Sequence, residues 1–153
     1  MEYITFFKES IKEAFEMMFD ESITLETENP APSWISSKGV AVIVGVTGAK
    51  KGRVLVDMPR STAMELAMRM DSELNNEDLA LFTIAEFCNI ASGGTVTAIN
   101  NNYRQAGLRL VTPSFFSGTN AKIFSPGLKS TMLSYTTRFG KIDFHIGFEG
   151  SLA

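Results

Sequence analysis

Glu86-Phe87-Cys88-Asn89-Ile90-Ala91-Ser92-Gly93-Gly94 lies within a long run whose apolar spacing predicts a helix. Residues three positions apart lie on the same face of a helix, so Glu86 and Asn89 point in one direction. At about 100° per residue, Phe87 and Cys88 fall on the opposite side, which is the natural core face. The stretch therefore presents a carboxylate and a carboxamide together, away from the core, on a rigid element.

This helix also contains residues that helices usually avoid. Asn is a weak helix former, and Gly93 and Gly94 each cost about 1 kcal/mol relative to Ala. A helix face that only needs to be soluble has no use for such residues, so we interpret Glu86 and Asn89 as site residues. Tight packing against a neighbouring helix is the alternative explanation for the two glycines.

The sequence on either side of this helix predicts an α+β domain. Apolar residues at helical spacing predict helices over residues 3–19, from an N-cap at Ser61 to Met70, and over residues 77–102. Extended segments are predicted over residues 40–46, 53–58, 108–111, 132–138 and 141–148. This order predicts a mainly antiparallel sheet with helices packed on one face. The strand blocks on the two sides of the central helices suggest an internal pseudo-repeat.

The last predicted strand indicates how the sheet is covered. Ile142, Phe144, Ile146 and Phe148 alternate with polar or small residues, so one face is expected to be buried and the other polar. Asp143 and His145 lie on the polar face. We interpret them as solvent-facing, because the sequence offers no third ligand that would make them a metal site.

Length and composition limit the possible functions. We expect one domain over residues 1–153, and the net charge of −3 argues against a nucleic-acid partner. The single cysteine, Cys88, excludes an internal disulfide and is expected to be a buried hydrophobe. The longest unbroken apolar run, residues 40–46, is too short to cross a bilayer, and no secretory signal is visible. We therefore expect a soluble cytoplasmic protein.

Common catalytic motifs do not account for this chain. Residues 44–52 superficially resemble a phosphate-binding loop, but they lack the Gly-Lys-Ser/Thr ending and join two strands, so a hairpin turn is the better interpretation. The Gly-x-Ser-x-Gly sequence of serine hydrolases is absent. The acid and amide at Glu86 and Asn89 are left as the candidate site.

Residues 85–93 resemble the Glu-x-x-Asn signature helix of the CheC/CheX/FliY phosphatases of bacterial chemotaxis. The resemblance extends to the first helix and to residues 112–118, which are similar to the strand entry after the signature helix. CheC-type members carry a second signature in the first helix. Here that helix contains Glu9-x-x-Lys12 and Glu13-x-x-Glu16 without Asn, so a CheX-type protein is the closer match. Phe82 departs from the Asp or Ser that the family often has four residues before the Glu.

The resemblance implies hydrolysis of the phosphoaspartate of a response-regulator receiver domain, CheY-P or a relative, in chemotaxis or another two-component pathway. It implies that Asn89 orients the attacking water and that Glu86 pairs with a receiver lysine. The receiver would supply the phosphoaspartate and its Mg²⁺, so this chain is expected to bind no cofactor.

The resemblance also implies a homodimer, because CheX-type relatives pair through sheet strands and apolar strands here would leave an open edge. An alternative function is a catalytically silent module that docks on a receiver domain or a flagellar-switch component through the same helix.

Overall fold

The computed structural model describes residues 3–124 and 128–149. Its helices are α1 (Tyr3–Phe19), α2 (Arg60–Met70) and α3 (Glu77–Asn102). Its strands are β1 (Thr24–Pro30), β2 (Trp34–Ser36), β3 (Gly39–Thr47), β4 (Gly52–Pro59), β5 (Arg109–Leu110), β6 (Ser114–Ser117), β7 (Lys122–Phe124), β8 (Lys129–Thr137) and β9 (Gly140–Phe148). The predicted helices are thus present. Helix α2, however, has Pro59 and not Ser61 at its N-cap, because the fixed backbone of proline can lead directly from β4 into the helix.

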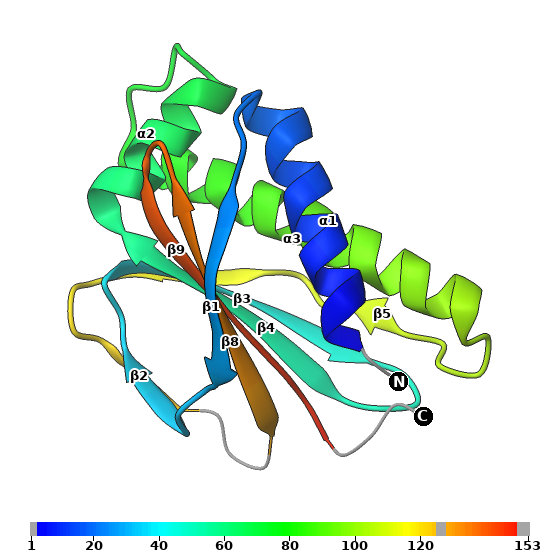
Figure 1. Cartoon of the computed structure of the whole chain (residues 1–153). Helices are drawn as coiled ribbons and strands as arrows, with labels where there is room; N and C mark the ends of the chain where they lie inside the picture. The colour runs from blue at the N-terminus through cyan, green and yellow to red at the C-terminus, as the bar shows by residue number, and fades with distance from the viewer. Residues whose placement is uncertain (1–2, 125–127, 150–153) are drawn as a thin grey trace.

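All described strands except β2 and β7 form one large antiparallel sheet in the order β1-β8-β9-β4-β3-β5, with β6 also paired to β3. Figure 1 shows the three helices on one side of this sheet. This arrangement confirms the predicted α+β class. The expected open apolar edge is wrong, however, because β3 and β4 lie inside the sheet. In the part of the chain that the structure describes, the edge strand β1 is polar and largely exposed.

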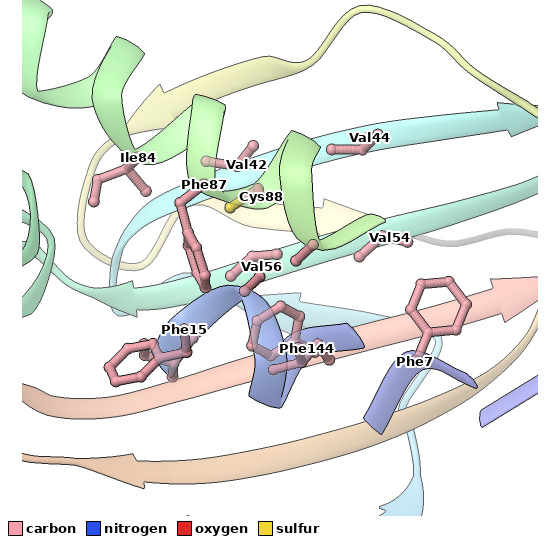
Figure 2. Close-up of a cluster of buried hydrophobic side chains, with 14 of the residues drawn as sticks. Phe7, Phe15, Val42, Val44, Val54, Val56, Ile84, Phe87, Cys88 and Phe144 are labelled. Atoms are coloured by element: carbon pink, nitrogen blue, oxygen red, sulfur yellow. The ribbon is translucent and has the colours of Figure 1, made fainter. Parts of the chain in front are cut away.

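The main core lies between the helices and the sheet. Phe87 and Cys88 of α3 point towards the sheet and towards Phe15 of α1 (Figure 2), and the rings of Phe15 and Phe87 lie 6.0 Å apart in an edge-to-face arrangement. Side chains on alternate residues of β3 and β4, such as Val42 and Val56, form the opposite wall. Cys88 is fully buried as predicted, and this burial raises the pKa of its thiol.

The opposite face of the sheet differs from the prediction. Asp143 and His145 were expected to face solvent, but they are only 7% and 8% exposed. Strands β2 and β7, which the sequence did not predict, form a second two-stranded sheet. Its Ile35 and Ile123 pack against the outer side of the main sheet, where Ala41 and Leu55 lie. A second, smaller apolar cluster therefore covers part of the face that was expected to be polar.

A network of polar contacts accompanies this second cluster. The Ser37 hydroxyl donates a hydrogen bond to Oδ1 of Asp57 at 2.6 Å, and the backbone N–H of Lys38 donates to Oδ2 at 3.0 Å. The ammonium of Lys38 forms an ion pair with Asp143 at 2.8 Å, and Asp57 and Asp143 are cross-strand neighbours. Burial raises the pKa of Asp57 despite these hydrogen bonds. The network joins the corner between β2 and β3 to the centre of the main sheet.

Helix α3 is long and apolar enough to cross a membrane, judged by length and composition alone. This property does not show in the unbroken apolar runs of the sequence, because polar residues such as Glu86 and Asn89 interrupt the helix. In the structure, 56% of its apolar window is buried inside the domain. The core helix of a soluble domain has the same properties, so this helix is weak evidence for a membrane span.

Candidate functional site

The candidate site lies on α3, whose N-terminus is well capped. The side chain of Asn76 accepts a hydrogen bond from the backbone N–H of Asp78 at 2.7 Å, which satisfies one of the free N–H groups of the first turn. Glu77 and Asp78 place negative charge in this turn, where the helix dipole favours it. Asn76 was not among the caps predicted from the sequence. The cap and the buried face of α3 together hold this helix in place.

Glu86 and Asn89 lie on the side of α3 that faces away from the core, as their spacing predicted. Glu86 is exposed and Asn89 is half-buried, whereas Phe87 and Cys88 between them are fully buried. Among residues 3–124 and 128–149, neither side chain has an intramolecular hydrogen bond or ion pair. Both polar groups are therefore available to another molecule.

Gly93 and Gly94 have different surroundings. A Cβ atom on Gly94 would overlap the hydroxyl of Ser10 on α1. That hydroxyl donates a hydrogen bond to the carbonyl of Ala91 at 2.6 Å. A Cβ atom on Gly93 would find only the Cδ1 atom of Leu110, at 3.7 Å. Close helix packing thus explains Gly94, whereas Gly93 leaves open space one turn beyond Asn89.

An apolar border runs along α3 next to Glu86. Phe82, one turn before Glu86, is 60% exposed, and Leu79 is 51% exposed. The ring of Phe82 is held edge-to-face against Phe115 of β6, with 5.0 Å between the ring centroids. This border was not predicted from the sequence, where Phe82 stood out only as a departure from a family pattern. Its signal was the placement of two large apolar residues on the polar side of the helix.

The charges near the site are mainly negative. Asp71 and Asp78 are exposed near the N-terminal end of α3, in addition to Glu86. Arg60, at the start of α2, is already paired with Glu77 of the first turn of α3. Over the residues that the structure describes, no group of three or more His, Cys, Asp or Glu side chains could hold a metal ion. The arrangement is suited to contact with a basic partner surface and to the orientation of a water molecule by Asn89.

Comparison with protein families gives one match, to the family described as chemotaxis phosphatase CheX, over residues 40–137. This match covers more than half of the chain and includes the signature segment of α3. A comparison with curated proteins finds no match.

Solved structures of similar fold cover almost the whole chain. A chemotaxis protein CheX from Desulfovibrio desulfuricans has a TM-score of 0.87 at 17% identity, covering 97% of this chain and 100% of its own. A putative chemotaxis protein from Desulfovibrio vulgaris Hildenborough has a TM-score of 0.85 at 18% identity, covering 97% of both chains. The CheX in a CheX–CheY–BeF₃–Mg²⁺ complex from Borrelia burgdorferi has a TM-score of 0.82 at 24% identity, covering 97% and 99%. At these identities the likeness is one of fold.

Proposed function

Since the chain belongs to the CheX family of chemotaxis phosphatases, we propose that it hydrolyses the phosphoaspartate of a CheY-type receiver domain. The observation that carries this proposal is the pair Glu86 and Asn89, both free of intramolecular partners on the outer face of α3. The complex of a similar CheX with CheY, BeF₃ and Mg²⁺ in Borrelia burgdorferi supports a CheY-type partner. The pathway would be chemotaxis or another two-component system.

The proposed mechanism is one of positioning. Phosphoryl transfer to water requires an in-line water molecule and neutralisation of charge, and little covalent chemistry from the protein. The carboxamide of Asn89 can both donate and accept a hydrogen bond, so it can orient a water molecule without acting as a base. Glu86 would pair with a lysine of the receiver and fix the helix against it. We propose that Mg²⁺ enters with the receiver and that this chain binds no cofactor.

Two substitutions test the proposal because they should fail in different ways. In Asn89→Ala the turnover of a phosphorylated receiver should fall by about 100-fold, because the water loses its positioning group. Binding to the same receiver loaded with BeF₃ and Mg²⁺ should be kept. In Glu86→Ala the free energy of receiver binding should weaken by about 1–3 kcal/mol, because a charged hydrogen-bond partner is lost. Turnover should fall together with affinity.

Asn101, an exposed asparagine near the other end of α3, offers a matched control. Asn101→Ala should hydrolyse the receiver as the unchanged protein does. Wild-type turnover in Asn89→Ala would contradict the mechanism. Tight binding of phosphorylated receivers by the unchanged protein, without any hydrolysis, would instead favour the catalytically silent docking module.

We also propose a homodimer, through a different surface from the one expected from sequence. Trp34 of β2 and Phe124 of β7 are directly opposite each other, and they are 53% and 59% exposed. The next residue pair, Ile35 and Ile123, packs against the main sheet. Because successive side chains of a strand point to opposite faces, Trp34 and Phe124 point away from the main sheet. Figure 1 shows β2 on the side of the sheet away from the helices, so α3 would stay outside this interface.

Light scattering at micromolar concentration should give a dimer mass for the unchanged protein. The double variant Trp34→Ser/Phe124→Ser should be monomeric, because it removes the aromatic area that two copies would bury. Its receiver phosphatase activity should remain. A monomer mass for the unchanged protein would contradict the proposal.

A further inference from the structure

A hollow of about 390 Å³ lies beside Glu86, between the end of α2 and the first turns of α3. Its lining includes Met70, Asp71, Leu74, Leu79, Phe82 and Glu86. Glu86 therefore belongs both to the candidate site and to the wall of the hollow. A molecule that pairs with Glu86 would therefore lie next to this depression.

The floor and wall of the hollow are apolar and well supported. Met70 and Leu74 are half-buried and pack against the main core. Phe82 is exposed, but its ring is fixed against Phe115. Large apolar side chains that are exposed together around a depression are typical of an interaction site. A side chain that enters the hollow would meet a surface that is already formed.

The charge of the hollow restricts what can enter. Among the described residues that line it, the charged ones are Asp71 and Glu86, both acidic. The two arginines of α2 are engaged elsewhere: Arg60 pairs with Glu77, and Arg69 contacts Glu21 and donates to the carbonyl of Phe19. A complementary surface would therefore carry a basic group next to a large apolar side chain.

We infer that this hollow receives a large apolar side chain of the receiver domain, next to the basic group that pairs with Glu86, and that Phe82 thereby selects among receivers. The inference rests on the proposed function, because Glu86 is shared by both. It adds a specificity contact that does not touch the reacting phosphoryl group. Changes in the hollow should therefore alter affinity and leave the chemical step intact.

Phe116 provides a matched control for Phe82. It is also an exposed phenylalanine, at 42%, but it is paired with Ala41 and lies on the opposite face of the sheet. The experiment measures kcat and KM for Phe82→Ala and Phe116→Ala on a panel of phosphorylated CheY-type receivers. It also measures the affinity of each variant for the same receivers loaded with BeF₃ and Mg²⁺. Circular dichroism and thermal melting check that both variants are folded.

For the preferred receiver, Phe82→Ala should raise KM by about tenfold and change kcat by less than about twofold. The differences in KM among the receivers should become smaller for Phe82→Ala. Phe116→Ala should have the same kcat and KM values as the unchanged protein. Asp71→Asn should weaken affinity at low salt more than at high salt, because an exposed charge is screened.

Two results separate failure of this inference from failure of the proposed function. Equal KM values and equal receiver preference for Phe82→Ala and the unchanged protein, which still hydrolyses a receiver, would overturn only the role of the hollow. Absence of both binding and hydrolysis by the unchanged protein across the panel would overturn the proposed function, and the inference with it.

Discussion

Two pairs of polar residues lie on opposite sides of this domain, and their surroundings differ. Glu86 and Asn89 lie on the outer face of α3 and have no intramolecular partners in the described part of the chain. Asp57 and Asp143 lie on the outer face of the sheet, buried and bonded to Ser37 and to Lys38. Glu86, Asn89 and Asp143 occupy positions that the sequence pattern assigned to a polar face. Only the first pair is open to another molecule.

The difference shows how to separate structural polar groups from functional ones. A buried polar group must be hydrogen-bonded or it destabilises the fold, so Asp57 and its partners are required for stability. An exposed group with no partner contributes little to stability, because water satisfies it. A fold that keeps such groups close together on a rigid helix therefore keeps them for contact with something else.

Removal of Asp57 tests the structural side of this contrast and should have the largest effect on stability. In Asp57→Ala the Ser37 hydroxyl and the Lys38 N–H lose their acceptor, so the free energy of unfolding should fall by about 3 kcal/mol. Glu86→Ala, in contrast, should change it by less than about 0.5 kcal/mol. Urea unfolding of both variants measures these values. A similar loss in the two variants would remove the distinction between the pairs.

The two adjacent glycines of α3 give the same contrast within one helix. Gly94→Ala should lower the free energy of unfolding by about 1–3 kcal/mol, because the new Cβ displaces the Ser10 hydroxyl. Gly93→Ala should raise it by about 0.5–1 kcal/mol, because alanine is the better helix former and meets no close contact. Thermal unfolding of both variants tests this, and equal melting temperatures would contradict it.

The buried His145 should make the free energy of unfolding depend on pH. Burial lowers its pKa, as do Arg53 and Lys38, while Asp143 opposes the shift. The unfolded chain therefore binds a proton at a higher pH than the folded one does, so stability is lost as pH falls below about 6.5. The loss contributed by His145 should be at most about 1.4 kcal/mol per pH unit.

The measurement compares the unchanged protein with His145→Gln by urea unfolding between about pH 7.5 and 5.5. The variant should show a flatter dependence on pH in this range. Asp57 acts in the opposite direction, because its raised pKa makes the folded state bind its proton more tightly than the unfolded chain does. Identical slopes for the two proteins would show that His145 does not titrate differently on folding.

The sequence predicted the three helices, the central strands and the outward direction of Glu86 and Asn89, because each depends on a local period. It did not predict β2 and β7, which are three residues long and pair across more than eighty positions of the chain. The ion pair that covers Asp143 comes from Lys38, far from it in the chain, so the burial of Asp143 could not be predicted from its own strand. The hollow beside Phe82 depends in the same way on how the end of α2 meets α3.

The contact between Ser10 and Ala91 has a consequence for the direction in which the site points. The Ala91 carbonyl accepts from the hydroxyls of Ser10 and of Thr95, at 2.6 and 3.2 Å, on the inner side of α3. Because Ser10 lies on α1, its bond to Ala91 restrains the rotation of α3 about its own axis. With side chains about 6 Å from that axis, a turn of about 10° would move the Asn89 amide by about 1 Å, enough to misplace a reacting water. A hydroxyl of α1 on the inner side of α3 thus helps to fix the direction of the Asn89 carboxamide on the outer side.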